Sequence, residues 1–133
     1  MPRPTAASKQ PEIVRRFLAL TTPIGAVEAK PMFGGYGFYF EGMIFALEAY
    51  GRIWLKADRE THAHFAKAGC ERFVYDGKTR PVEMPYWTLP KEAEHGGAAL
   101  RRWVDLSLAA ARRSARSRRS STRRWPPQEP DFI

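Results

Sequence analysis

The sequence predicts an α+β fold, in which a mostly antiparallel sheet of five or six strands packs against helices in the order α-β(3–4)-α-β2-α. Three observations predict it. Short runs rich in aromatic and β-branched residues follow one another with single glycines between them. Apolar residues recur with a helical period near both ends of the chain. Asp76-Gly77, a common hairpin dipeptide, separates two further strand-like runs.

The first predicted element is a helix that begins after Ser8, a suitable N-cap, with Pro11 in its first turn. Thr22-Pro23 ends it, because the residue before a proline avoids helical backbone angles. The apolar residues on one face of this helix are Ile13, Val14, Phe17 and Leu18.

A first strand is predicted over Val27–Phe33, and a three-stranded meander follows it. Gly42 and Gly51 separate the meander strands, since glycine readily adopts the positive φ that tight hairpins need. The three strands are Tyr36–Glu41, Met43–Ala49 and Arg52–Ala57.

Asp58 is suited to cap a second helix over Arg59–Ala68, and Gly69 to end it. The hairpin strands Arg72–Tyr75 and Pro81–Trp87 come next. A last helix begins near Ala98, and its stripe of apolar or small residues comprises Leu100, Trp103, Val104, Ser107 and Ala111.

Length and charge define the domain organisation. The 133 residues suffice for one domain, and 44% hydrophobic residues suffice for a core. Most of the net charge of +8 comes from seven arginines within residues 112–124, a stretch without an acid. We therefore expect a flexible N-terminus over residues 1–10, a domain over residues 11–115 and a disordered basic tail over residues 116–133.

Cys70 is the one cysteine, so no intrachain disulfide can form. No apolar run reaches the roughly 18 residues that span a bilayer, and the N-terminus lacks the apolar stretch of a secretory signal. These features predict a cytoplasmic protein with no membrane partner.

The arginine cluster is a candidate nucleic-acid contact, because guanidinium groups bind phosphate backbones without reading sequence. The alternative is a solvated tail that has no specific partner, neither DNA nor RNA. The arginines concerned are Arg112, Arg113, Arg116, Arg118, Arg119, Arg123 and Arg124.

The sheet-forming runs contain more aromatic residues than one small core needs. If one face of the sheet packs on the helices, the other could stay open as a partner or homodimer surface. Ordinary core packing is the alternative. The candidate surface residues are Tyr36, Tyr39, Trp54 and Tyr86.

No catalytic or metal-binding pattern emerges. His62 and His64 are two apart on a predicted helix, so they face different directions and cannot bind one metal ion together. Gly35-Tyr36-Gly37-Phe38 partly matches an RRM motif, but the basic and final aromatic positions differ. We expect no cofactor and no enzyme activity, with a nucleophilic Cys70 as a remote alternative.

Several ordered strings resemble the N-terminal domain of the TfoX/Sxy competence regulators. They are MFGGYGFYFEGMIFALEAYGRIWLKAD over Met32–Asp58, then Phe73 and Tyr75, then Met84-Pro85-Tyr86-Trp87-Thr88-Leu89-Pro90, and then Leu100–Ala111. The second, C-terminal helical domain of full-length regulators is replaced here by basic residues, so a stand-alone domain is expected.

The resemblance implies an antiparallel α+β domain with a non-catalytic role in bacterial transcription control, and it brings no catalytic residues. We therefore expect a protein-interaction module with a protein partner, such as the transcription machinery, and a basic tail that contacts DNA. The alternative is a nucleic-acid-binding module that stacks bases on the sheet aromatics.

Overall fold

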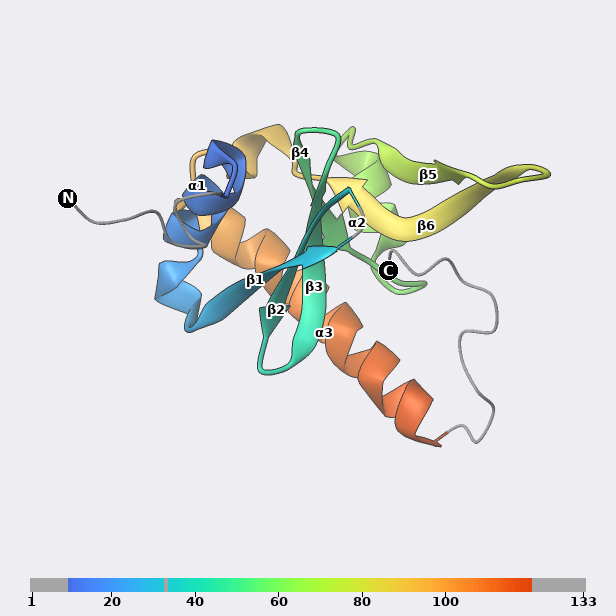
Figure 1. The fold of residues 1–133 in the computed structure, drawn as a ribbon. Helices are drawn as coiled ribbons and strands as arrows, with labels where there is room; N and C mark the ends of the chain where they lie inside the picture. The colour runs from blue at the N-terminus through green and yellow to red at the C-terminus, as the bar shows by residue number, and fades with distance from the viewer. Residues whose placement is uncertain (1–9, 33, 121–133) are drawn as a thin grey trace.

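The computed structural model in Figure 1 describes residues 10–32 and 34–120. Two short 3₁₀ turns, η2 (Thr22–Ile24) and η3 (Lys91–Ala93), precede β1 and the last helix. The helices are α1 (Glu12–Leu20), α2 (His62–Lys67) and α3 (Gly97–Ser120). The strands are β1 (Val27–Met32), β2 (Gly35–Phe40), β3 (Met43–Ala49), β4 (Arg52–Lys56), β5 (Arg72–Asp76) and β6 (Pro81–Thr88).

The six strands form one sheet in the order β1-β2-β3-β4-β6-β5, and every neighbouring pair is antiparallel. Strands β1 to β4 are a continuous meander, as predicted. The chain then passes through α2 to the far edge, so that β5 lies outside β6. The predicted α+β class and antiparallel sheet are therefore confirmed.

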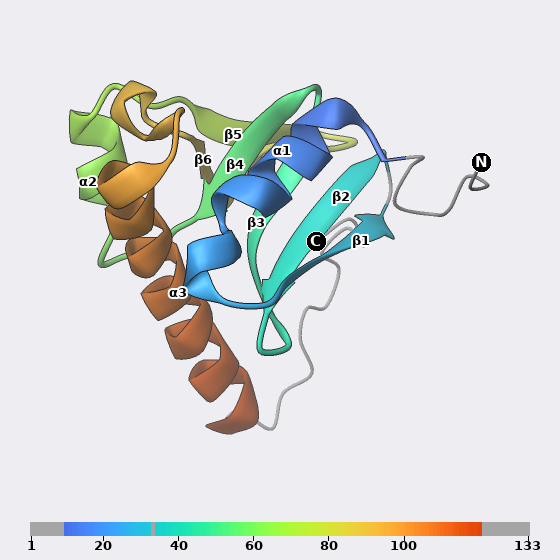
Figure 2. The same cartoon turned by 90° about the vertical axis from the view of Figure 1, so that its left-hand side faces the viewer.

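The main core lies between the helices and one face of the sheet (Figure 2). The ring centroids of Phe17 on α1 and Phe38 on β2 are 4.7 Å apart, edge to face. Phe65 of α2 packs against Trp103 of α3 at 5.0 Å. Each large side chain buried here contributes about 1.5–3 kcal/mol. These contacts hold all three helices on the same side of the sheet.

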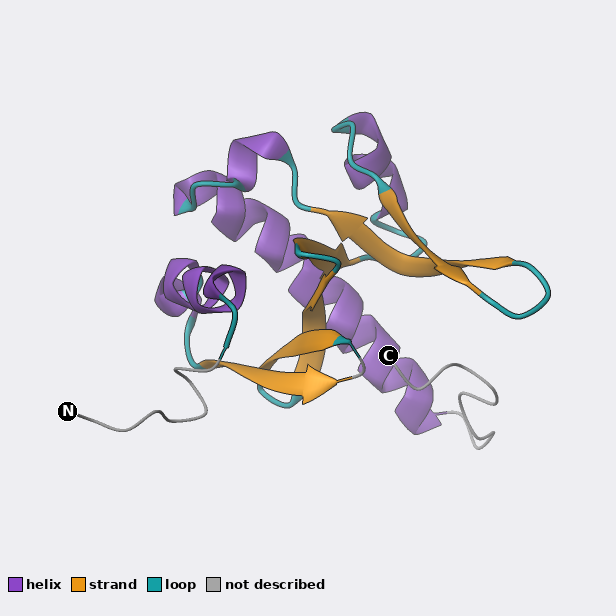
Figure 3. Ribbon diagram, turned by 45° about the horizontal axis from the view of Figure 1, so that its top comes forward, coloured by secondary structure: helices purple, strands orange, loops and turns teal. Residues whose placement is uncertain are grey.

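A second apolar cluster lies on the opposite face. Trp54 lies between Ile53 and Leu55, which both belong to the main core, so strand alternation turns it to the other face. The β5–β6 hairpin projects from this end of the sheet (Figure 3), and its Phe73 ring lies 4.6 Å from Trp54. The buried members are Leu47, Trp54, Phe73, Met84 and Tyr86.

A register shift in the β2–β3 pair changes which face the residues of β3 occupy. Phe38 pairs with Ala46 and Tyr39 with Ile44, which leaves Phe45 as an extra residue on β3. Phe45 and Ala46 are consequently both buried in the main core. Without this bulge, alternation would turn one of them toward the second cluster.

Several element boundaries differ from the prediction. Pro11 precedes the first helix instead of lying in its first turn, and the predicted cap Ser8 lies outside the described residues. The second helix is shorter than predicted and begins only at His62. Asp76 belongs to β5, so the hairpin turn is formed by residues 77–80.

The last helix is longer than predicted. It continues to Ser120, so residues 116–120, expected in a disordered tail, are helical. Residues 1–9 and 121–133, which make up the rest of the two expected flexible segments, lie outside the described residues. Arginine and alanine are good helix formers, which explains how the helix continues after its buried face has ended.

Two different physical requirements explain the first two glycines of the Gly-Gly-Tyr-Gly string. Gly34 has φ of +70°, in the left-handed region that glycine adopts at no cost. Gly35 begins β2, where a Cβ atom would clash with the backbone carbonyl of Glu48 on β3. Gly34 therefore completes the turn before β2, and Gly35 allows β2 to approach β3 closely.

We predict that Gly35→Ala destabilises the domain by about 2 kcal/mol, because the carbonyl of Glu48 belongs to a central strand and cannot move away. The matched control is Gly34→Ala, which meets no atom within 4 Å and loses only about 1 kcal/mol from its positive φ. Urea denaturation measures both. A larger loss for Gly34→Ala would contradict this account.

Candidate functional site

The predicted aromatic surface is not assembled by the fold. Trp54 and Tyr86 are only 6% and 0% exposed, because Trp54 of β4 packs with residues of the β5–β6 hairpin, Tyr86 among them, in the second cluster. Tyr36 packs against the main core, whereas Tyr39 lies on the opposite face of β2. The expectation that Trp54 and Tyr86 are open to a partner is therefore wrong.

Three cationic side chains lie over aromatic rings on the face of the sheet opposite the helices. The Nζ atom of Lys30 lies 4.8 Å from the centre of the Tyr39 ring. Arg52 lies over Trp54 at 5.4 Å, and Lys56 over Tyr86 at 5.1 Å. In each contact the charged end of the side chain lies over the ring, which is the geometry of a cation–π interaction. This arrangement leaves little room for bases to stack on Trp54.

The candidate arginines fall into four groups. Arg112 and Arg116 are exposed on α3, while Arg113 is partly buried and forms ion pairs. Arg118 and Arg119 lie in α3, in the part of the helix whose side chains are not described. Arg123 and Arg124 lie outside the described residues. The structure therefore separates Arg113 from its neighbours.

Arg113 binds the turn that precedes α2. Its Nε and Nη2 atoms donate to the two carboxylate oxygens of Asp58 at 2.6 and 3.0 Å, and Nε lies 3.4 Å from Glu60. The hydrogen bond from Arg113 is the main reason that the pKa of Asp58 is lowered. Asp58 also accepts from the backbone N–H of Glu60 and the hydroxyl of Thr61. It therefore organises this turn and joins it to α3.

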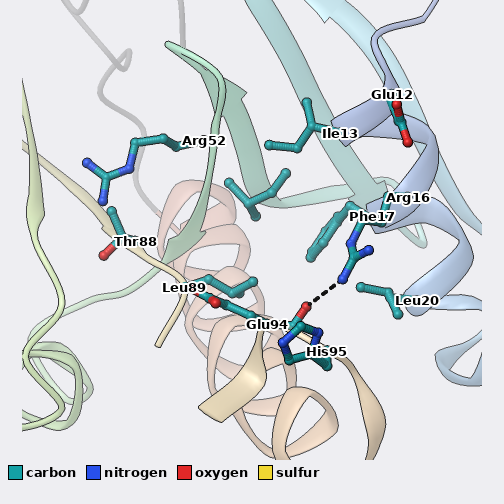
Figure 4. A pocket seen from close by; sticks show the side chains of 11 residues that line it. Glu12, Ile13, Arg16, Phe17, Leu20, Arg52, Thr88, Leu89, Glu94 and His95 are labelled. Carbon is teal, nitrogen blue, oxygen red and sulfur yellow. Dashed lines mark hydrogen bonds between the residues drawn. The ribbon is translucent and has the colours of Figure 1, made fainter. Parts of the chain in front are cut away.

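An open groove of about 550 Å³ lies between α1, the start of β4 and the connection from β6 to α3 (Figure 4). Its apolar floor continues into the main core and consists of Ile13, Phe17, Leu20, Ile53 and Leu89. Its polar rim consists of Glu12, Arg16, Arg52, Thr88, Glu94 and His95.

The rim groups bond mainly to the protein itself. Arg16 donates to the backbone carbonyl of Glu94 at 3.2 Å, across one end of the groove (Figure 4). At the other end, Arg52 forms an ion pair with Glu71 at 2.9 Å. Within residues 10–32 and 34–120, no three His, Cys, Asp or Glu side chains are grouped as a metal ligand set. The groove is therefore suited to apolar recognition.

Nothing in the sequence predicted this groove. Its walls come from three segments far apart in the chain, residues 12–20, 52–53 and 88–95. The one sequence signal was the half-apolar character of α1, whose Ile13 and Leu20 flank the buried positions Val14 and Phe17. Such residues at the border of an apolar face indicate partial exposure but not what they line.

His62 and Cys70 are both partly buried within the fold. The indole N–H of Trp87 donates to Nδ1 of His62 at 2.9 Å, so this nitrogen must be unprotonated. Burial, and next the charge of Arg72, lower the pKa of His62. Burial raises the pKa of the Cys70 thiol, which makes it less nucleophilic at neutral pH.

Comparison with known proteins identifies the class of this domain and then its family. The described part is an antiparallel sheet with helices on one face, an apolar groove and a last helix that ends in basic residues. Residues 19–111 match the TfoX N-terminal domain, and the chain belongs to this family. This confirms the resemblance seen in the sequence.

A curated relative is "DNA transformation protein TfoX1" of Aliivibrio fischeri (strain ATCC 700601 / ES114), which is 28% identical over 109 residues. The match covers 82% of this chain and 52% of the relative, so the chain spans about half the length of that protein. Among the described helices, none combines the length and the apolar character that crossing a membrane requires.

We predict that the domain loses stability as the pH falls below about 6.5, because unfolded His62 then binds protons that the folded form resists. His62→Gln should flatten this dependence, since an amide oxygen can still accept from Trp87 without titrating. His64→Gln is the control, because His64 is exposed on the same helix. Thermal unfolding at a series of pH values tests this, and equal slopes for wild type and His62→Gln would contradict it.

We predict that Arg113→Gln lowers the free energy of unfolding by about 1 kcal/mol, through loss of the two-pronged contact with Asp58. The pKa of Asp58 is lowered in the folded state, so the difference from wild type should shrink as the pH falls below about 4. Arg112→Gln, the exposed neighbour, should change stability little. A pH-independent loss would show that the carboxylate is not involved.

Proposed function

We propose that this chain is a non-catalytic regulatory domain that acts in the bacterial cytoplasm by binding a protein of the transcription apparatus. Membership of the TfoX N-terminal domain family and the likeness to a DNA transformation protein support a role in competence-type control. The described residues offer apolar and ionic surfaces but no convergent set of ionisable groups at a cavity.

The apolar groove is the observation that carries this proposal. Half-buried side chains of α1 and the β6–α3 connection expose the edge of the core there (Figure 4). A small-molecule site usually directs a few polar groups inward, toward the ligand. Here Arg16 and Arg52 instead hold protein acceptors at the rim. We therefore propose that the occupant is an amphipathic helix of the partner, which buries apolar side chains against the floor.

The rim carries both signs of charge, which suits an amphipathic helix with both acidic and basic residues beside its apolar stripe. Arg16, Arg52 and His95 lie on the rim with Glu12 and Glu94. Such charges fix the orientation of a partner more than they add affinity. A second copy of this chain seated in the groove would be seen in the same experiments as a homodimer.

A second candidate function is contact between the arginines of α3 and nucleic acid. The exposed positions of Arg112 and Arg116 favour it. The alternative of base stacking on the sheet is not favoured, because Trp54 and Tyr86 are buried. We propose this contact as an addition to partner binding, and not as a replacement for it.

We predict that Ile13→Arg abolishes the regulatory activity, because a charged side chain at the groove floor excludes apolar side chains of the partner. The matched control is Ala19→Arg, which places the same charge on an exposed position of α1 outside the groove. The readout is transcription from the promoters that respond to deletion of the wild-type gene, measured after complementation with each variant.

Ile13→Arg should restore less than one tenth of the response and Ala19→Arg nearly all of it, with thermal unfolding confirming that both variants fold. A photo-crosslinking side chain at position 13 should also attach to an identified transcription protein. Full complementation by a folded Ile13→Arg variant would refute binding through the groove, and crosslinking only to a second copy would identify a homodimer instead.

A further inference from the structure

The C-terminal end of α3 projects beyond the domain. Ala110 and Ala111 are the last fully buried residues of the helix, and Arg112 is exposed. The helix nevertheless continues to Ser120, and Figures 1 and 2 both show this end extending past the turn between β2 and β3. We call residues 112–120 the basic arm.

Arg113 anchors the base of the basic arm to the domain. Its guanidinium is held by both carboxylate oxygens of Asp58, and its side chain is only 27% exposed. Asp58 is itself fixed by the turn before α2. The preceding turns of the same helix are packed in the main core, so the arm leaves the domain in a fixed direction and Arg113 holds its base in place.

The composition of the arm favours phosphate over other partners. After Arg113 it contains only arginine, serine and alanine, and no acid occurs before Glu129. A protein interface needs buried apolar or aromatic anchors, and a membrane-surface helix needs an apolar face. The arm has neither. Guanidinium and hydroxyl groups are the donors that proteins use on nucleic-acid backbones.

The dimensions of the arm also fit duplex DNA. Nine helical residues span roughly 13 Å, and a helix with its side chains is about 10–12 Å wide. The major groove of B-DNA is about 12 Å wide, with phosphates along both borders. The partial negative charge at a helix C-terminus, about half an elementary charge, opposes phosphate, but several guanidinium groups outweigh it.

We propose that the basic arm binds the phosphate backbone of duplex DNA without reading its sequence, and that Arg113 positions the arm instead of contacting phosphate. This inference rests on the second candidate function, to which it adds the class of ligand and the role of each arginine, and it does not depend on the groove. It divides the arginines by role: Arg112 and Arg116, which are exposed, are contact residues, whereas Arg113, which is partly buried and held by Asp58 and Glu60, is a positioning residue.

The test measures binding of the full chain to a 20-base-pair DNA duplex by fluorescence anisotropy between about 50 and 200 mM salt. The double variant Arg112→Gln/Arg116→Gln should bind about tenfold more weakly, and its salt slope should be less steep by about 1.8. Arg113→Gln should keep the wild-type slope while its unfolding temperature falls. Arg15→Gln/Arg59→Gln, two exposed arginines outside the arm, controls for net charge.

Four outcomes would overturn the proposal. They are a wild-type chain that does not bind the duplex, a double variant with an unchanged salt slope, an equal loss in the Arg15/Arg59 control, and a slope reduced by Arg113→Gln. If the chain bound an RNA duplex more tightly than the DNA duplex, the proposal of DNA as the partner would be wrong. Ile13→Arg should bind the duplex normally, so failure of the groove and failure of the arm are distinguishable.

Discussion

The structure depends on how one antiparallel sheet buries apolar residues on both of its faces. The helices of the described part lie on one face, so the other face requires a cover of its own. The projecting β5–β6 hairpin provides it, by placing Phe73 and Met84 against Trp54 and Leu47. The charged ends of lysine and arginine side chains lie over three of the rings on this face. The aromatic richness of the sequence therefore stabilises the fold, and does not by itself indicate an open surface.

Local patterns in the sequence were sufficient to predict the strands of the sheet, but not to predict how β5 and β6 cover its second face. Alternation and glycine placement predicted the strands of the meander and their order, because each strand is decided by its own residues and its adjacent turn. Alternation along β4 explains why Trp54 lies on the face opposite the helices. It could not show that β5 and β6 return over that face, since Phe73 and Trp54 meet only through the tertiary pairing of β4 with β6.

Long-range pairing also explains the other differences. Asp58 was expected to cap a helix at Arg59, but it forms a turn whose carboxylate is shared with Arg113, and the helix begins at His62. Nothing near Arg113 in the sequence distinguishes it from Arg112, because its partner lies 55 residues away. The groove likewise joins segments separated by more than 30 residues. Sites of this kind come from the packing of elements, and sequence periodicity records only that each element has an apolar side.

Helix α3 links the two proposed binding surfaces at a fixed distance. Glu94 and His95 of the groove rim directly precede the helix, and the basic arm is its other end. A helix of 24 residues spans roughly 36 Å. The middle of the helix is buried against β3 and β4 through Trp103, Val104 and Leu108, so it cannot pivot between its ends. Two ligands bound at these surfaces would therefore not collide, and their separation would be set by the rigid helix. A domain built in this way would hold a protein partner and a DNA backbone in a constant relative position without any change in its own structure.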